Sequence, residues 1–497
     1  MTDNTMQPYQ LRINGRWCDS DSGESFDSFD PFTGKPWARI ARGNAADVDD
    51  AVRAAHTALT DSAWAEMTAS ARGHLLHRLA DAIAEHSAEL AHTEVRDNGK
   101  LFAEMSGQTA YIPEWFRYYG GLADKIEGSV VPLDKKGYFA YTTTSPVGVV
   151  GIITPWNSPL LLLTWKLAAA LAAGCTVVIK PSEHTSASTL EFVALLEDTG
   201  LPPGVVNVVT GFGDEVGSPL VDHPLVRKVS FTGSDATGRR IGEQAARGVK
   251  HVGLELGGKS PNIVFDDADI DAAVNGAVSG IFAATGQTCI AGSRLLVQSS
   301  IHDEVVARVV ELSKTARMGN PADPDTQVGP VTTRDQYEKV LSYIDIAKAE
   351  GARLRLGGAA ATRPECGDGW FVEPTIFTGV DNSSRIAQEE VFGPVLSVIR
   401  FDDEKDAVAI ANDSRYGLGA GVWTSDMGRA FRMAEAIESG TVWVNTYRAV
   451  SYMMPFGGVK DSGLGRENGI SAIHDYLETK SVWINTGAPT GNPFVLR

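Results

Sequence analysis

Short runs of β-branched residues alternate with helical stretches through the middle of this chain. Between two such runs, Pro159 stands where a first helical residue is expected and Gly174 where a C-terminal cap is expected. Strand–helix–strand alternation builds a parallel sheet through right-handed crossovers. The chain is therefore predicted to have an α/β fold. Its first predicted strands are Val147–Ile153, Thr176–Ile179, Val205–Val209 and Lys228–Phe231.

A second alternating block covers roughly residues 262–444, with predicted strands such as Asn262–Phe265, Arg294–Gln298 and Val395–Phe401. The blocks meet near Gly257-Gly258, where the repeating unit changes without a low-complexity linker. Two helices with apolar faces are predicted before the first block. One face holds Val48, Val52, Ala55 and Leu59, and the other holds Leu75, Leu79, Ala82, Ile83 and Leu90.

The charge balance excludes two classes of partner. Lys and Arg number 44 against 62 Asp and Glu, so the net charge is −18. An acidic protein of this kind is not expected to bind nucleic acid or an anionic membrane surface. The most apolar stretch, Pro159–Ala173, contains Lys166 and is too short to span a bilayer. The N-terminal segment lacks the basic and apolar regions of a signal peptide.

The four cysteines are scattered, and no C-x-x-C pair occurs among Cys18, Cys175, Cys289 and Cys366. This pattern predicts free thiols in a reducing compartment rather than a disulfide framework or a zinc site. His74 and His77 share a helical face but have no third ligand, so no metal site is expected. Cytoplasmic location is the resulting expectation.

Three glycine-rich or acidic motifs point to functions that their context does not support. Gly253–Ser260 matches a phosphate-binding loop, but a strand rather than a helix is predicted after Ser260. Gly211–Gly217 resembles a dinucleotide loop whose last glycine comes one residue late. The acidic run Asp266–Asp271 lacks the glycine that a calcium loop needs, and it fits a helix cap better.

Three other segments carry residue types that could perform chemistry. Cys289 lies in a polar turn between a helix and a strand, Glu255 ends an apolar strand, and Asn157 precedes a helix. Taken singly, each has an ordinary structural explanation. A lone cysteine is most often inert and buried, the glutamate could be a paired charge, and the asparagine could be an N-cap.

Together these segments resemble the aldehyde dehydrogenase superfamily over nearly the whole chain. The resemblance implies a Rossmann-like coenzyme domain (1–127 and 146–256), an α/β catalytic domain (257–460), and a small β oligomerisation arm with the C-terminal segment (128–145 and 461–497). It also implies a homo-oligomer, with a tetramer favoured over a dimer. The matching motifs are Thr154–Pro159, Lys180–Glu183, Phe231–Gly238, Leu254–Pro261, Phe282–Arg294, Glu389–Pro394 and Pro455–Lys460.

In this family resemblance, Cys289 is the nucleophile and acts as a thiolate. The Asn157 amide and the Cys289 backbone N–H hold the oxyanion, and Glu255 is the general base that releases the acid. Lys166 and Glu467 match positions associated with a proton path, and an ordinary salt bridge between them is the alternative. The expected reaction oxidises an aldehyde to a carboxylic acid through a thiohemiacetal and a thioester.

The resemblance implies NAD as the cofactor, with NADP possible. A carboxylate at Glu183 accepts a hydrogen bond from a ribose 2′-hydroxyl and repels a 2′-phosphate. Lys180 would share the adenosine ribose, Glu390 would hold the nicotinamide ribose, and Phe392 would lie at the nicotinamide. The complete expected cofactor set is Ile153, Thr154, Trp156, Lys180, Glu183, Gly213, Gly233, Ser234, Glu390 and Phe392.

The expected aldehyde tunnel is mostly apolar and aromatic, with no obvious charged anchor. This composition favours aliphatic, terpenoid or aromatic aldehydes, and semialdehydes or betaine-type aldehydes are the alternative. Ser158 replaces an aromatic residue that is frequent after the catalytic Asn, which would widen the tunnel. Coenzyme-A-acylating enzymes and a catalytically silent structural member of the fold are rival interpretations. The tunnel residues are Tyr111, Trp115, Leu161, Trp165, Thr288, Ile290 and Val450.

Overall fold

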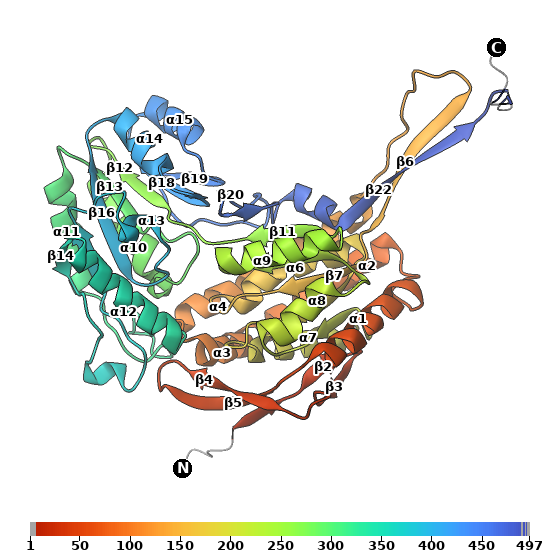
Figure 1. Cartoon of the computed structure of the whole chain (residues 1–497), viewed down its shortest axis with the longest axis horizontal. Coiled ribbons are helices and arrows are strands. Elements are labelled where there is room, and N and C mark those ends of the chain that lie inside the picture. The colour runs from red at the N-terminus through yellow and green to blue at the C-terminus, as the bar shows by residue number, and fades with distance from the viewer. Residues whose placement is uncertain (1–5, 489–490, 493, 495–497) are drawn as a thin grey trace.

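The computed structural model describes residues 6–488, 491–492 and 494. Two α/β lobes lie side by side, and a two-stranded ribbon projects away from both of them (Figure 1). Each lobe is built around its own mostly parallel sheet, as the alternating pattern predicts. Among the described residues no helix combines the length and apolar character needed to cross a membrane.

The first sheet has the strand order β21-β11-β10-β7-β8-β9-β2-β3. All four strands predicted for the first block are confirmed. From β7 the chain crosses to β8 and β9 on one side and then to β10 and β11 on the other, which creates a switch point between β7 and β10. The strands are β2 (Leu11–Ile13), β3 (Arg16–Cys18), β7 (Val149–Ile153), β8 (Thr176–Lys180), β9 (Val206–Val208), β10 (Val226–Thr232), β11 (His251–Glu255) and β21 (Gly463–Leu464).

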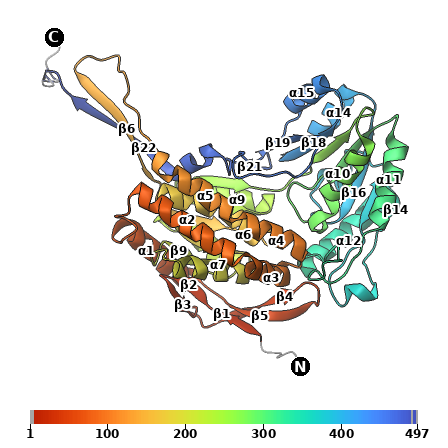
Figure 2. The same ribbon diagram turned by 180° about the vertical axis from the view of Figure 1, so that it is seen from behind.

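Helices cover both faces of this sheet, so alternate strand residues enter different cores. In β7, Val150 and Ile152 pack against one set of helices, and Val149 and Ile153 pack against the other. Figure 2 shows part of the first set from behind. That set is α2 (Ala69–Glu85), α5 (Pro113–Leu122), α6 (Pro159–Ala173) and α7 (Ala187–Asp198), and the second is α1 (Ala45–Thr60), α8 (Ser218–Asp222) and α9 (Asp235–Arg247).

Two local predictions for these helices have different outcomes. Helix α6 begins at Pro159 and is capped by Gly174 in the left-handed region at φ 92°, as predicted. The apolar face drawn through Leu90 is wrong as a single helix. Helix α2 ends at Glu85, and α3 (Ser87–Asn98) begins after His86, which leaves the helical region at ψ 9°. Both helices bury an apolar face, so the spacing alone does not reveal the break.

The second sheet has the order β14-β15-β16-β13-β12-β18-β19, and all its neighbouring strands except the β14–β15 pair are parallel. Helices α10 (Ile270–Phe282) and α11 (His302–Lys314) pack on one face, and α12 (Arg334–Ala349) and α15 (Met427–Ala436) on the other. Asp269 caps α10, as predicted for the acidic run. The strands are β12 (Pro261–Val264), β13 (Arg294–Gln298), β14 (Arg353–Leu356), β15 (Thr375–Thr378), β16 (Val395–Phe401), β18 (Gly419–Trp423) and β19 (Thr441–Val444).

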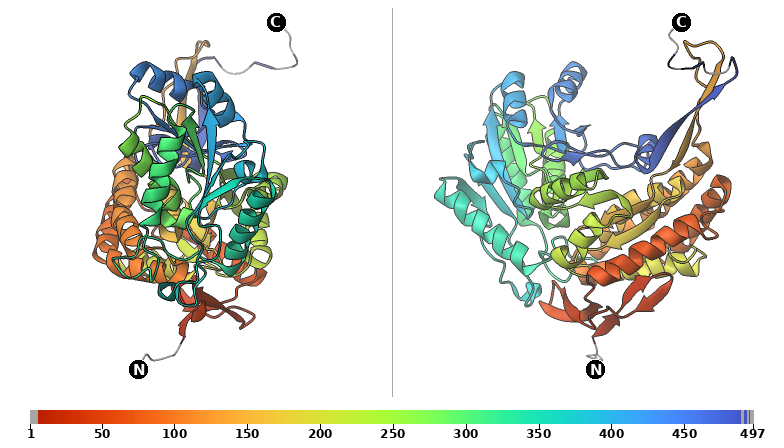
Figure 3. Two further views of the ribbon diagram at one scale, coloured as in Figure 1. Left: turned by 90° about the vertical axis from the view of Figure 1, so that its left-hand side faces the viewer. Right: turned by 45° about the vertical axis from the view of Figure 1, so that its right-hand side comes forward.

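The projecting ribbon pairs β6 (Tyr138–Pro146) with the C-terminal strand β22 (Leu477–Asn485) in antiparallel register. The terminal strand thus finds its partner within the same chain, and the right-hand view of Figure 3 shows the ribbon standing clear of both lobes. The preceding residues of segment 461–497 do not join the ribbon. Gly463–Leu464 instead extends the first sheet beside β11.

Candidate active site

The carboxyl ends of four parallel strands bring the predicted residues to one edge of the first sheet. Glu255 is the last residue of β11, Lys180 is the last of β8, Gly233 follows β10, and Asn157 lies shortly after β7. This edge includes the switch point between β7 and β10. In open α/β sheets, such a point is where ligands bind.

The Cys289 turn lies against this edge from the second lobe. Ala284 and Thr285 have positive φ values of 55° and 54°, and Gly286 follows at φ 71°. A Cβ on Gly286 would lie 2.1 Å from the Gly393 carbonyl oxygen, so only glycine fits there. Strained backbone of this kind persists only where its surroundings fix it. The turn is therefore held in one shape by its contacts.

Asn157 is one of those contacts. Its Nδ2 donates to the Gln287 carbonyl oxygen at 3.0 Å, and the asparagine is buried. Its other N–H remains available to a ligand. The backbone N–H of Cys289 has no acceptor within the described part of the chain. Two donors thus lie close to the Cys289 side chain, which is the arrangement predicted for an oxyanion site.

A cavity of about 130 Å³ brings the two lobes' residues together. Of the predicted site, it includes Asn157, Trp156, Cys289, Gly233, Ser234, Glu390 and Phe392. Three further lining residues lie outside every motif of the sequence analysis, namely Leu162, Gln336 and Lys339. Gln336 and Lys339 lie on α12, far from every quoted motif, so only the fold could reveal them.

The surroundings of Cys289 favour the thiol over the thiolate. Burial raises the pKa of the Cys289 thiol to about 12, and the Glu390 and Glu255 carboxylates add to the rise. The expectation that Cys289 acts as a thiolate therefore requires a proton to leave first. In the ligand-free protein at neutral pH, the thiol form predominates.

This pKa predicts slow, strongly pH-dependent alkylation of Cys289. Because only the thiolate reacts, the rate with iodoacetamide is expected to rise about tenfold per pH unit from pH 7 to 9. Mass spectrometry of the peptide that contains Cys289 measures the rate. A rate that is flat over this range would mean that the thiol is already ionised and would contradict the assignment.

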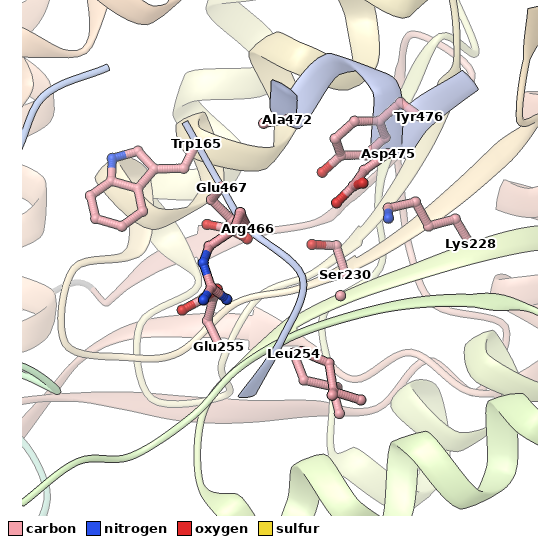
Figure 4. Close-up of a pocket in the computed structure, with 12 residues that line it drawn as sticks. Trp165, Lys228, Ser230, Leu254, Glu255, Arg466, Glu467, Ala472, Asp475 and Tyr476 are labelled. Atoms are coloured by element: carbon pink, nitrogen blue, oxygen red, sulfur yellow. The ribbon is translucent and has the colours of Figure 1, made fainter. Parts of the chain in front are cut away.

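Glu255 faces a different, smaller pocket from the one that Cys289 borders. Figure 4 shows Glu255 with Arg466 and Glu467 along this pocket, and Trp165 also lines it. Burial, reinforced by the charge of Glu467, raises the pKa of Glu255 well above its usual value, against the opposing charge of Lys166. One carboxyl oxygen of Glu255 has no partner within the described residues. Glu255 is therefore poised to exchange a proton.

Lys166 and Glu467 form a buried ion pair behind Glu255. The ordinary salt bridge considered as an alternative for these residues is thus present. Their charges still act on Glu255, in opposite directions. The same pair can therefore be a structural salt bridge and lie on the route of a proton.

The loop after β10 has the shape of a phosphate site. Ser234 caps α9 by accepting from the Thr237 N–H, and a Cβ on Gly233 would lie 2.4 Å from the Phe231 ring. A helix that begins at a strand end offers N–H groups and a positive dipole to an anion. The buried Oγ1 atoms of Thr154 and Thr232 have no partner within the described residues. This loop could accept a pyrophosphate.

Lys180 and Glu183 form an ion pair with 2.9 Å between Nζ and Oε2. Burial works against ionisation of Glu183, but the charge of Lys180 and the hydrogen bonds to the carboxylate together keep the glutamate pKa below its usual value. Glu183 borders a second cavity, together with His184 and Phe212 beside Gly213. A carboxylate is therefore available here for a ribose hydroxyl.

Glu390 and Phe392 form the other end of the first cavity. The Glu390 Oε1 accepts from the Gly258 N–H at 3.0 Å, and a Cβ on Gly257 would lie 2.5 Å from its Oε2. Trp156 and Phe392 meet edge to face with centroids 5.2 Å apart. Ile153 and Thr154 were also predicted here but do not line this cavity, and the Ile153 side chain packs into the core on the α9 face.

The predicted tunnel residues gather around a cluster of aromatic rings. Trp115 is fully buried and donates from its indole N–H to Asn468 Oδ1 at 2.7 Å, while stacking on Trp165 at 6.2 Å. Trp115 and Trp165 therefore form a rigid wall of the predicted tunnel. Tyr111, Leu161 and Val450 pack against the same core as the half-buried Cys289, with Ile290 inside it, and Thr288 precedes Cys289 in the turn.

Two aromatic residues of this region escaped the sequence analysis. Tyr452 packs against Tyr111 at 5.9 Å and against Trp115 at 5.8 Å. Phe456 meets Trp165 edge to face at 4.9 Å. Phe456 lies within the Pro455–Lys460 motif, so that motif could have identified it.

Comparison with known proteins decides the family. The family model described as "Aldehyde dehydrogenase family" matches residues 17–482. The chain belongs to the aldehyde dehydrogenase family. The enzyme class expected from the sequence is thus confirmed. The strand predicted after Ser260 is also confirmed, since Pro261–Val264 forms β12, so Gly253–Ser260 does not open a helix as a phosphate-binding loop does.

Individual aldehyde dehydrogenases match along nearly their whole length. The (Z)-2-((N-methylformamido)methylene)-5-hydroxybutyrolactone dehydrogenase of Acinetobacter baylyi is 48% identical over 99% of this chain and 100% of its own. A betaine aldehyde dehydrogenase of Staphylococcus aureus, solved with NAD+, has 41% identity and a TM-score of 0.96, with 98% and 97% of the chains covered. An NAD+ complex from Bacillus cereus has 44% identity and a TM-score of 0.94, covering 96% and 97%.

Proposed function

We propose that this aldehyde dehydrogenase oxidises an aldehyde to a carboxylic acid with NAD, through a covalent adduct on Cys289. The observation that carries the proposal is the cavity where Cys289 and Asn157 meet Glu390 and Phe392. A nucleophile, an oxyanion donor and a candidate cofactor site there share one space. Within the described residues no cluster of metal-ligating side chains occurs.

The Cys289 sulfur adds to the aldehyde carbon and forms a thiohemiacetal. The developing oxyanion accepts hydrogen bonds from the free Asn157 N–H and the Cys289 backbone N–H, and one such donor typically contributes about 3 kcal/mol to the transition state. NAD, when bound, supplies the acceptor for the hydride that leaves this adduct. The thioester that remains on Cys289 must then be hydrolysed.

Glu255 is the general base for that hydrolysis. A carboxylate there takes a proton from water, which then attacks the thioester carbon. The buried Lys166–Glu467 pair tunes Glu255 and offers the proton a route away. Because the pKa of Glu255 is raised, the base form and the hydrolysis rate increase as pH rises.

Several chain features support NAD as the cofactor. The Gly233–Ser234 loop suits the pyrophosphate, and Glu183 would accept from an adenosine ribose hydroxyl. Glu183 repels a 2′-phosphate, so NAD is preferred over NADP. Glu390 would hold the nicotinamide ribose. The NAD+ complexes of the Staphylococcus and Bacillus relatives support this assignment.

The simplest test mixes purified protein with NAD and a panel of aldehydes, and follows the absorbance of the reduced cofactor. We expect turnover with aldehydes that have an apolar body, because aromatic and aliphatic side chains surround Cys289. Absence of turnover by folded protein with every aldehyde and with both NAD and NADP would instead favour the silent structural member of the fold.

We also propose that the protein is a homo-oligomer, with a tetramer favoured. The ribbon exposes large apolar side chains, including Phe139 (44% exposed), Trp483 (53%) and Ile484 (45%), and an apolar strip of this kind suits burial against a second copy.

The reactive thiol of Cys289 fits a reducing compartment, so the cytoplasm is the proposed location.

Replacing both Phe139 and Ile484 with Asp tests the assembly, since these residues pair across the ribbon. Light scattering is expected to give about four times 53.0 kDa for the unaltered chain and a smaller mass for the double variant. The matched control is Phe431→Asp on α15, which lies away from the ribbon. Asp at exposed Lys135 and Asn492 would be a poor comparison, because these residues are already polar. An unaltered chain of 53.0 kDa in solution would contradict the proposal.

A further inference from the structure

Lys100 is a buried cation beside the proposed reaction centre that no step of the mechanism uses. It is 3% exposed, and its Nζ donates to the Ser158 hydroxyl at 3.0 Å. Ser158 directly follows Asn157, whose amide reaches the Cys289 turn. The serine that replaces the frequent aromatic residue is therefore one half of a buried polar pair.

The backbone directs Lys100 into this position. Gly99 ends α3 in the left-handed region at φ 74°, and a Cβ there would lie 2.8 Å from both Pro31 and Pro330. The Lys100 backbone N–H donates to the Asn98 side chain at 2.8 Å. The turn is thus fixed on both sides of the lysine.

No carboxylate lies within salt-bridge distance of the Lys100 ammonium in the described part of the chain. The nearby Glu94 and Glu104 each use one oxygen to accept from a backbone N–H, that of Leu160 and that of Ala284. Two of the three Lys100 N–H groups consequently have no acceptor among the described residues. Leaving such donors unmatched in a buried place is costly, so a ligand oxygen there would be stabilised.

Burial and neighbouring charges both act on the ionisation of Lys100. Burial lowers the pKa of Lys100 to about 8, against the effect of Glu104, and the charges of Arg448 and Cys289 also act on it. At neutral pH the ammonium form still predominates. Arg448, held at φ 65° and bonded to the Ser279 carbonyl oxygen at 3.1 Å, adds a second positive charge.

We propose that Lys100 and Ser158 anchor a carboxylate carried by the aldehyde substrate, with Arg448 contributing a second positive charge. This inference rests on the proposed function and specifies its substrate class as short ω-oxo carboxylic acids. The ammonium pairs with the carboxylate, and the Ser158 hydroxyl donates to it while accepting from Lys100. The apolar walls contact the methylene groups between the two ends of the substrate.

The expectation of a tunnel without a charged anchor arose because Lys100 lies in the turn after α3, outside every quoted motif. Only the fold brings it to Ser158.

The test compares 5-oxopentanoate with its methyl ester, which has the same chain but no charge. The unaltered enzyme is expected to show a kcat/KM at least about tenfold higher for the acid, as a charge-assisted hydrogen bond in a buried site provides. Lys100→Met should bring this ratio close to one by raising KM for the acid. Lys100→Arg should retain most of the preference, and Ser158→Ala should lose part of it.

Lys314→Met, on the exposed surface of α11, is the matched control and should keep the full preference. Glutarate should inhibit oxidation of the ester competitively, and its inhibition constant should rise in Lys100→Met. If that variant does not fold, glutarate inhibition of the unaltered enzyme and Ser158→Ala decide the question.

The outcomes separate this inference from the proposed function. Failure to oxidise either substrate or any other aldehyde would overturn the proposed function itself. Oxidation of the ester as fast as the acid, or an equal loss of activity on both in Lys100→Met, would overturn the anchor alone. An equal loss of activity on both substrates in Lys100→Met would make Lys100 a structural residue.

Discussion

Cys289→Ala is expected to abolish aldehyde oxidation while NAD still binds. The substitution removes the sulfur that borders the cavity. Without the covalent adduct no hydride donor forms, so kcat should fall by at least about 10³-fold. Alanine is smaller than cysteine and fits the same turn, whose shape depends on Gly286 and the Asn157 contact. The variant should therefore keep its fold.

Two measurements are needed for this variant. Steady-state assays with the best aldehyde of the panel give kcat, and fluorescence titration gives the dissociation constant for NAD. The constant should change by less than about threefold, because the other cavity residues remain. Cys18→Ala is the control, since Cys18 lies in β3 at the far edge of the first sheet. Oxidation retained by Cys289→Ala would contradict the nucleophile assignment.

The sequence predicted the parts of the fold that depend on local pattern. Strand β7 has β-branched residues on both faces, and this predicts a strand buried on both sides. Pro159 and Gly174 mark the ends of α6 because each residue has a preferred backbone conformation there. Each of these signals spans only a few residues and survives in any tertiary context.

Other features depend on packing between distant segments. The break at His86 leaves an apolar face on both sides, so periodicity could not locate it. The pairing of β22 with β6 joins residues more than 300 positions apart, and no local pattern in the sequence identifies that partner. Long-range pairing of this kind is decided by which edges the rest of the fold leaves open.

In the candidate site, too, some features follow from local sequence motifs and others depend on packing between distant segments. Cys289, Asn157 and Glu390 come from separate motifs, and the resemblance could name them, but only the fold shows that they share a cavity. Ile153 was expected at that cavity and packs into the core instead, because the alternation along β7 turns its side chain toward α9. Gln336, Lys339 and Lys100 had no motif to identify them.

The raised pKa of Cys289 was also beyond sequence reasoning. It results from burial and from two carboxylates, Glu390 and Glu255, that lie more than 30 residues away in either direction along the chain. Such a group must lose a proton before it can attack.

Glu255→Gln is expected to form the thioester and then stall. Glutamine has nearly the same shape as glutamate but does not accept a proton, so the attacking water is no longer activated. Steady-state kcat should fall by about 10²- to 10⁴-fold, whereas formation of the acyl-enzyme should be affected less. A rapid burst of about one equivalent of reduced cofactor per subunit should precede the slow phase.

Stopped-flow absorbance measures the burst, and mass spectrometry of the quenched protein measures acylation of Cys289. Glu478→Gln, at an exposed glutamate on the ribbon, is the matched control and should turn over without a burst larger than that of the unaltered enzyme. Steady turnover by Glu255→Gln without an accumulated thioester would mean that another base activates water. Loss of the burst as well would place Glu255 in the first step, as the group that accepts the Cys289 proton.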